Sequence, residues 1–413
     1  MYIRTFIKTI YFCAFFGMIT ICCGETGEKT LSKKLLELES KIQQQQKQIE
    51  ELQKAESAKV PVSFLSLSPY VEGLKIKGDL SFRADQRIQR GTLKNDERQR
   101  LRQRLRLGLV WGDQAGNWTV SAGLATGGIK PDSTYDTFGE DDIFETGDIR
   151  LDYAYVKYVL GSLTTSFGQQ HNPFVRTDMV WDNNVRPSGL TFQYKFSDKW
   201  SLVGGGYDVA HFGVAQANAI LSAIQVVCSE KKKDSGYTIA ATCYYYNDAT
   251  AQNTNAFSRS SDKLVKSEEY AYNFADIYGS FDCPLTADLI LKAYGEMSYN
   301  FGAEGDPGEG LLGGTLDPSE NRFAYVVGTR LSRGKISLGY EWSEIESDSV
   351  FAPIKNPIFG TASGVTDVRG HSMALGYKFT KNMSFKGKIN FVERWKDADD
   401  ELVLYQLNLG WKF

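Results

Sequence analysis

The sequence has little of what helical membrane proteins and metal-dependent enzymes depend on. Its 413 residues include 3 histidines and 6 cysteines. Cys228, Cys243 and Cys283 lie well inside the chain, and their wide spacing without a CxxC pair predicts neither a disulfide framework nor a zinc site. After the amino-terminal leader, no segment reaches the roughly eighteen consecutive apolar residues of a membrane helix, which excludes a helical inner-membrane protein.

Motifs for covalent chemistry are also lacking. Gly204-Gly205-Gly206 is not followed by Lys and Ser or Thr, so it is not a phosphate loop. Asp208 and His211 are close enough in sequence to suggest a water-activating pair, but acidic loops make such neighbours common. The net charge of −3 is less basic than that of a general nucleic-acid binder. We therefore predict no catalytic residue, no metal site, no cofactor, no nucleic-acid partner and no enzymatic activity.

Aromatic residues and glycine are abundant, and the last twelve residues show how they are used. Aromatics make up 13% of the chain, and 39 residues are glycine. In 402–413 the apolar residues alternate with polar ones, which is the period of a strand. The stretch resembles the terminal assembly signal of bacterial outer-membrane barrels, which the barrel assembly machinery would recognise. The residues that carry this resemblance are Tyr405, Leu409, Trp411 and Phe413.

The amino terminus is typical of an export signal. Arg4 and Lys8 precede an apolar run from residue 10 to residue 23, too short to span a bilayer comfortably as a helix. We expect a signal peptide over 1–24. Lipidation at Cys22 or Cys23 is the alternative, although Ile21 stands where a small residue would be expected.

A heptad pattern follows over 28–56. Its seam residues are Leu31, Leu35, Leu38, Ile42, Gln45, Ile49 and Leu52. This spacing predicts a short periplasmic coiled coil, and the alternative is a single polar helix or a spacer. The cell wall is a candidate partner of the coiled coil. Residues 57–72 contain Pro61 and Pro69 and are predicted to be a linker.

From residue 73 onward, two-residue alternation recurs between turn signals. The predicted strands are 74–88, 99–111, 118–127, 148–159, 163–169, 189–197, 200–208, 218–228, 236–246, 272–282, 287–300, 322–332, 335–345, 371–380, 384–395 and 402–413. We therefore expect an all-β fold for 73–413, a 16-stranded antiparallel transmembrane β-barrel in the outer membrane. Because 210–219 is ambiguous, the count could be 14 or 18.

The predicted connections alternate between short and long, as they do in up-and-down barrels. Connections such as 161–162 and 333–334 are brief, whereas 128–147, 170–188 and 346–370 are long. An even number of strands then places both ends of the barrel, and the amino-terminal segment, in the periplasm.

One predicted strand carries a row of arginines. Alternate residues from Arg98 to Arg106 share a face, and Leu101, Leu105 and Leu107 lie on the other. An arginine that faces lipid at mid-membrane costs about 2–4 kcal/mol, so the row is expected to face the lumen. With the preceding strand it forms a predicted cationic wall of Lys75, Lys77, Arg83, Arg87, Arg98, Arg100, Arg102, Arg104 and Arg106.

Two interpretations of the cationic wall remain open. Arginines two apart are about 6.6 Å from each other, and in water they repel by only about 0.6 kcal/mol. The wall can therefore stay unpaired and draw anions through a pore. Alternatively, its arginines pair with acids across the lumen, for which Asp152, Asp276, Glu296 and Glu341 are candidates.

Several motifs in 73–413 resemble the bacterial putative porin family, distant relatives of phosphate-selective porins. The most specific is the block 172–190, and others are the arginine run at 100–109 and the segments 124–127 and 151–155. The resemblance implies a sixteen-stranded, trimeric outer-membrane channel. By analogy, 170–188 forms a constriction loop with Asn172, Pro173, Phe174, Arg176, Asp178, Trp181, Asp182 and Arg186. Phosphate specificity is not implied, because Arg176 and Arg186 are balanced by Asp178 and Asp182.

The expected function is an outer-membrane porin, a passive channel for small hydrophilic solutes or ions that prefers anions if the wall is unpaired. The alternative is a structural tether or adhesin that links the outer membrane to the cell wall.

Overall fold

The computed structural model describes 73–413 except for residues 92–93, 113–115, 129–131, 141–142, 144–145, 211–218, 234, 248–271, 305–307, 310–314, 362–363 and 397–399. The described residues lie in one compact unit, Glu72–Phe413. The predicted signal peptide, coiled coil and linker over 1–72 lie outside the described residues, as does His211.

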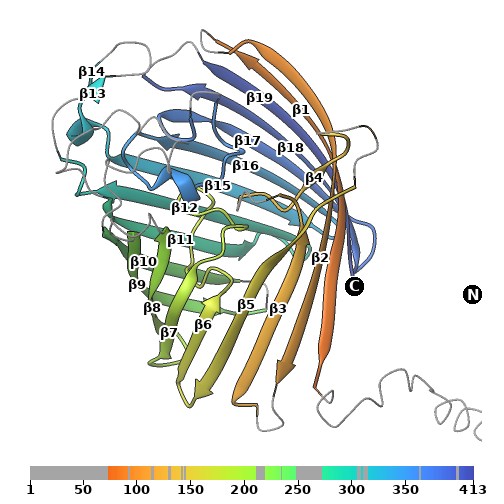
Figure 1. The fold of residues 1–413 in the computed structure, drawn as a ribbon, viewed down its shortest axis with the longest axis vertical. Helices are drawn as coiled ribbons and strands as arrows, with labels where there is room; N and C mark the ends of the chain where they lie inside the picture. The colour runs from red at the N-terminus through yellow and green to blue at the C-terminus, as the bar shows by residue number, and fades with distance from the viewer. Residues whose placement is uncertain are drawn as a thin grey trace, which may run out of the picture. The chain divides into compact units, whose positions relative to one another are not determined.

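Sixteen long antiparallel strands of the described chain form one closed barrel (Figure 1). They are β1 (Lys75–Arg90), β2 (Asp96–Gly112), β3 (Trp118–Thr126), β5 (Ile149–Leu160), β6 (Leu163–Gln169), β7 (Ser188–Lys195), β8 (Trp200–Ala210), β9 (Ala219–Lys231), β10 (Gly236–Asn247), β11 (Asn273–Pro284), β12 (Leu289–Asn300), β15 (Phe323–Arg333), β16 (Ile336–Ile345), β17 (Val368–Lys378), β18 (Met383–Arg394) and β19 (Glu401–Lys412). The predicted sixteen-stranded barrel is confirmed, and each predicted strand overlaps one observed strand.

The first and last strands close the barrel. β1 and β19 pair from Asp79 with Lys412 to Arg90 with Glu401. Beyond β19, Phe413 exchanges two backbone hydrogen bonds with Gly78, with N···O distances of 2.9 and 3.0 Å. A Cβ atom on Gly78 would stand 2.6 Å from the Phe413 ring and 2.7 Å from the Arg106 carbonyl oxygen, so a larger residue here would force the seam to shift.

The alternation of side chains separates an apolar outer surface from a polar inner one. Leu101, Leu107 and Leu109 of β2 are exposed on the outer face. Similar residues recur on the other strands, including Ile224 of β9 and Leu338 of β16. An outer apolar band of this kind is what a barrel needs in a hydrocarbon environment.

The smaller elements lie in the long connections between strands. β4 (Asp136–Thr137) pairs with β2 at Arg102 and Gln103, after β3 has ended. β13 (Gly308–Glu309) pairs with β14 (Thr315–Leu316), and the short 3₁₀ helices are η4 (Pro318–Glu320) and η5 (Ala352–Ile354). No helix in the described part of the chain has the length and apolar character to cross a membrane.

Candidate functional site: the inner wall and the inward loops

The arginine row of β2 faces the interior of the barrel. Leu101 is 63% exposed on the outer face, whereas the neighbouring Arg102 side chain is 12% exposed. Arg102 contacts the segment 133–135, which lies against the inner surfaces of β1 and β19. The arginines therefore stand on the face that the alternation predicted.

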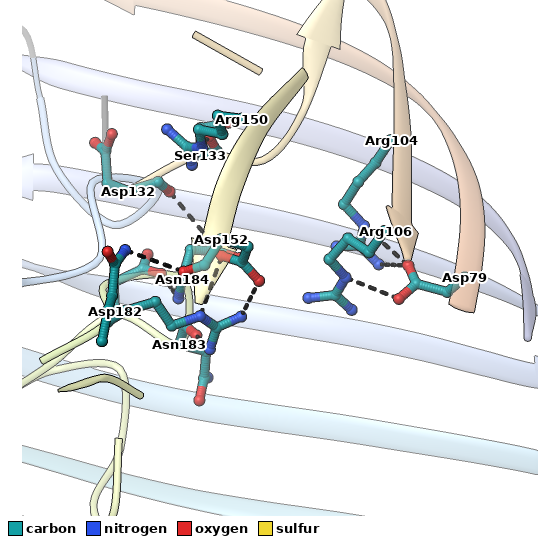
Figure 2. Close-up of polar contacts among 12 residues, drawn as sticks. Asp79, Arg104, Arg106, Asp132, Ser133, Arg150, Asp152, Asp182, Asn183 and Asn184 are labelled. Atoms are coloured by element: carbon teal, nitrogen blue, oxygen red, sulfur yellow. Dashed lines mark hydrogen bonds and ion pairs between the residues drawn. The ribbon is translucent and has the colours of Figure 1, made fainter. Parts of the chain in front are cut away.

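Two aspartates of the neighbouring strand pair with the middle of the row. Asp79 of β1 lies between Arg104 Nη2 and Arg106 Nε, each at 2.7 Å (Figure 2). Asp85 accepts a hydrogen bond from Arg100 Nε at 3.0 Å and lies 4.0 Å from Arg102 Nη1. The ladder explains this pairing, because Asp79 stands opposite Arg106, and Asp85 stands opposite Arg100.

The acids suggested as partners across the lumen bind other groups. Asp152 holds Arg186 through two hydrogen bonds, at 2.8 and 3.1 Å. Glu296 accepts a hydrogen bond from the backbone N–H of Thr177. Asp276 accepts one from the Thr242 hydroxyl at an O···O distance of 2.7 Å. Glu341 accepts one from the Tyr294 hydroxyl, also at 2.7 Å. Among the described residues, the ion pairs of the row therefore come from β1.

A register shift places Asp152 where it can hold Arg186. In the ladder between β3 and β5 the register shifts between Gly123 and Leu124, and Asp152 is skipped. Asp152 and Tyr153 are consequently both buried, although strict alternation would point one of them outward. A Cβ atom on Gly123 would stand 2.3 Å from the Tyr153 ring, so the glycine gives this ring its space.

Cations at both ends of the wall have no ion pair within the described part of the chain. They are Lys75 and Lys77 at one end, and Arg87 and Arg98 at the other. Arg87 and Arg98 stand opposite each other in the ladder, and the buried Arg87 Nε finds no hydrogen-bond partner among the residues that the structure describes. A pocket at this end is lined by Arg87, Gln89, Lys94, Asp96, Arg98 and Thr361, and Asp96 pairs with Lys94 at 2.9 Å.

The connection 170–187 folds into the barrel, as the predicted constriction loop would. Its backbone N–H groups donate to two buried side chains of the wall, Val175 to Gln225 of β9 and Thr177 to Glu296 of β12. On the other side, Arg186 reaches Asp152 of β5. Only the interior is within reach of all three strands, so the loop crosses it.

Apolar side chains of this loop form the centre of a buried cluster. Phe174, Val180 and Trp181 are buried among the inner side chains of strands from β8 to β19. The Trp181 indole donates to the Val185 carbonyl at 3.1 Å, which satisfies its one polar group. The charged residues Arg176, Asp178, Asp182 and Arg186 lie on either side of the buried pair Val180 and Trp181 in the sequence. Asn172 caps the Phe174 N–H at 2.9 Å, and Pro173 lies between them.

A second long connection, 346–367, packs against the first one inside the barrel. The Asp182 N–H donates to the Ile354 carbonyl at 2.7 Å, and the Asn356 amide donates to Asp178 at 3.1 Å. Phe351 lies 4.4 Å, centroid to centroid, from Tyr246 of β10. Sequence analysis did not identify this loop as inward-facing, although its apolar residues Val350, Phe351, Ile354, Ile358 and Phe359 were a signal.

Two ionisable groups are buried where these loops meet. Burial lowers the pKa of Lys355 to about 7, although Asp178, Glu341 and Asp182 oppose this and Lys388 reinforces it. Lys355 Nζ donates to the Phe359 carbonyl at 2.7 Å, with no carboxylate in the ion-pair range among described residues. Burial also raises the pKa of Asp182 to about 6. Both side chains therefore lose charge readily near neutral or mildly acidic pH.

A third inward segment, 132–137, was not predicted. Tyr135 is 8% exposed, and its ring lies over the guanidinium groups of Arg83, Arg102 and Arg104. The Asn184 amide donates to the Asp132 carbonyl at 3.3 Å and so connects this segment to the inward connection 170–187 (Figure 2). No cluster of three or more metal-binding side chains occurs among the described residues.

This geometry places the chain in the class of porin-type β-barrels. OmpF of Salmonella typhi, in a structure titled as a complex with daunomycin, is similar in fold, with a TM-score of 0.51 and 11% identity over 83% of this chain and 99% of that chain. A mutant of the Rhodopseudomonas blastica porin matches with a TM-score of 0.47 and 12% identity over 82% of this chain and 100% of that chain.

The family model described as a putative porin matches residues 82–282. This match confirms the resemblance to the putative porin family, and together with the barrel fold it indicates an outer-membrane location. The search of curated proteins found no match.

Proposed function

We propose that the protein is an outer-membrane channel for the passive diffusion of small hydrophilic solutes or ions, and that it prefers anions. The observation that carries the preference is the set of cations at the two ends of the wall that have no ion pair with a described residue, Lys75 and Lys77 at one end and Arg87 and Arg98 at the other. Unpaired charges of one sign raise the local concentration of the opposite ion.

The middle of the wall contributes less to this preference. Asp79 and Asp85 offset part of the charge from Arg100 to Arg106, and their pairs are short and sheltered. A permeating anion would therefore meet net positive charge mainly at entry and exit, and Asp178 and Asp182 of the constriction loop oppose it in between.

The remaining parts of the proposal follow from the sequence and the family. We propose a trimer inserted by the barrel assembly machinery, with a signal peptide and a periplasmic coiled coil before the barrel. Tyr405, Leu409, Trp411 and Phe413 are the proposed assembly signal, and they share one alternation of β19 and its extension. Residues 170–187 are proposed as the constriction.

One observation favours the alternative, a structural tether or adhesin. The apolar cluster of Phe174, Trp181 and Phe351 fills part of the interior near the long connections. A barrel whose loops close the lumen completely would serve as an anchor rather than a channel.

Planar-bilayer recordings of purified protein under a KCl gradient test the channel. We expect stepwise conductance and a reversal potential with the sign of the chloride equilibrium potential. The double variant Arg87→Ser and Arg98→Ser should move this reversal potential toward zero. Arg333→Ser is the matched control, because Arg333 pairs with Asp288 at an exposed turn, at 2.8 Å. No conductance from folded protein would favour the tether, and an unchanged reversal potential would refute the role of the end cations.

A further inference from the structure

The segment 132–137 is built into the wall by contacts on both of its sides. β4 continues the sheet beside β2, and the Phe138 N–H donates to the Leu101 carbonyl at 3.0 Å. Arg150 Nη2 donates to the Ser133 carbonyl at 2.8 Å, and the Thr126 hydroxyl donates to the Thr134 carbonyl at 2.9 Å. The position of Tyr135 is therefore fixed by its backbone as well as by its side chain.

The Tyr135 ring lies over three guanidinium groups of the wall. The Cζ atoms of Arg83, Arg104 and Arg102 lie 3.7, 4.9 and 5.7 Å from the ring centroid. Cations within about 6 Å of an aromatic face are attracted by its quadrupole. One ring thus gathers three charges that would otherwise repel one another.

The tyrosine hydroxyl and the backbone complete this arrangement. The hydroxyl donates to Asn408 Oδ1 at 3.2 Å and lies 3.0 Å from Ser81 Oγ. Asn408 Oδ1 also accepts from Arg83 Nε at 2.6 Å. Arg102 Nη2 donates to the Tyr135 carbonyl at 2.8 Å and to Ser133 Oγ at 3.1 Å. Several guanidinium donors are thus occupied, namely Arg83 Nε, Arg102 Nη2, and the Arg104 Nε and Nη2 that bind Asp79, whereas Arg102 Nε is buried without a partner among the described residues.

We propose that Tyr135 is a specificity-determining residue that covers Arg83, Arg102 and Arg104 and withholds them from direct contact with permeating anions. This inference rests on the proposed channel function. A covered guanidinium keeps its charge but cannot donate to an anion in the lumen, because the ring and the segment backbone stand in between. The cover limits anion contacts to the ends of the wall and thereby keeps the channel from trapping anions at its middle.

The chemical reactivity of the arginines tests the shielding by Tyr135 without depending on conductance. Folded, detergent-solubilised protein is treated with phenylglyoxal, which modifies accessible arginines, and the rate at each site is measured by peptide mass spectrometry. Arg98 is the internal reference, because it is exposed and is not one of the three arginines that lie at the Tyr135 ring. In the wild-type protein, Arg83 and Arg102 should react much more slowly than Arg98.

Two variants separate the ring from the hydroxyl. Tyr135→Ser should speed the modification of Arg83 and Arg102 by about two- to thirtyfold, which corresponds to the loss of one cation–π contact. Tyr135→Phe keeps the ring and should leave both rates near those of the wild type. Folding is verified by the electrophoretic shift between unheated and heated samples.

The outcomes distinguish a failure of the proposed shielding by Tyr135 from a failure of the proposed channel function. Equal modification rates for Arg83, Arg102 and Arg98 in the wild-type protein would refute the shielding by Tyr135, even if no variant folds. Rates for Arg83 and Arg102 that Tyr135→Ser leaves unchanged would also refute it. In bilayers, Tyr135→Ser should shift the reversal potential further to the anion side. If the wild-type protein does not conduct, the proposed function fails, whereas slow modification of Arg83 and Arg102 that Tyr135→Ser relieves still supports the cover.

Discussion

The two sides of the barrel interior are built by different physical means. On β1 and β2, charged side chains pair along the ladder and are held by hydrogen bonds and one aromatic ring. Between β8 and β19, apolar side chains of the strands pack against two inward loops. The first side holds its charges by ion pairs, hydrogen bonds and ring contacts, and the second side buries apolar surface. The contrast shows that one alternating pattern can line a channel on one side and build a core on the other.

The largest expected effect comes from breaking the apolar side. Trp181→Ala should destabilise the loop packing by about 3–5 kcal/mol, because a large buried ring is lost and a cavity is left. Single-channel conductance should rise as the loop moves away from the wall. Trp200→Ala is the control, since Trp200 is 50% exposed on the outer face. Equal heat stability of the two variants would show that the loop core contributes little.

The stability of the apolar side should depend on pH, because Lys355 is a base buried where the two inward loops meet. Lys355 has a pKa of about 7 in the folded protein and near 10.5 when exposed. The unfolded chain binds more protons between these values, so the contribution of Lys355 to stability rises with pH from about 7 to 10.5. Below pH 7 the destabilisation is complete.

Lys355→Met tests that contribution. The variant should raise the midpoint of heat-induced unfolding by more at pH 6 than at pH 10, where the wild-type lysine costs little. Asp182 acts in the opposite sense, because its raised pKa lowers stability as pH rises from about 3.8 to 6. A gain that does not change between pH 6 and pH 10 would contradict the neutral-lysine account.

The smallest expected effect concerns the charged side. Asp79→Asn removes the carboxylate between Arg104 and Arg106, and anion preference should increase modestly because both arginines are partly screened by water. Measurement of the reversal potential in KCl gives the direction. Asp288→Asn, at an exposed turn, should leave it unchanged. A shift toward cations would indicate that the pairs hold the arginines in place for the anion.

The strands could be predicted because alternation fixes both the period and the facing of each one. The facing of Arg98 to Arg106 followed from the same rule. The ion-pair partners of these arginines could not be predicted. Asp79 and Asp85 are on the preceding strand, but the register that sets them opposite Arg106 and Arg100 depends on the hairpin between the two strands.

The inward course of 170–187 was anticipated by analogy with known porins and not through periodicity. The inward segment at Tyr135 and the loop at Lys355 have no alternation to mark them, because their conformation is set by contacts with distant strands. The register shift that turns both Asp152 and Tyr153 inward also interrupts the alternation of side chains from which the strands were predicted. Long-range contacts of this kind are absent from any local pattern.

The ladder between β1 and β19 also has a kinetic meaning. Every other ladder between the sixteen long strands joins strands that follow each other along the chain, whereas this one brings together Arg83 and Asn408, 325 positions apart. The entropy of closing so long a loop is offset only when the intervening strands are already in place. We therefore expect closure at this seam to come late in folding, after the strands between β1 and β19 have paired.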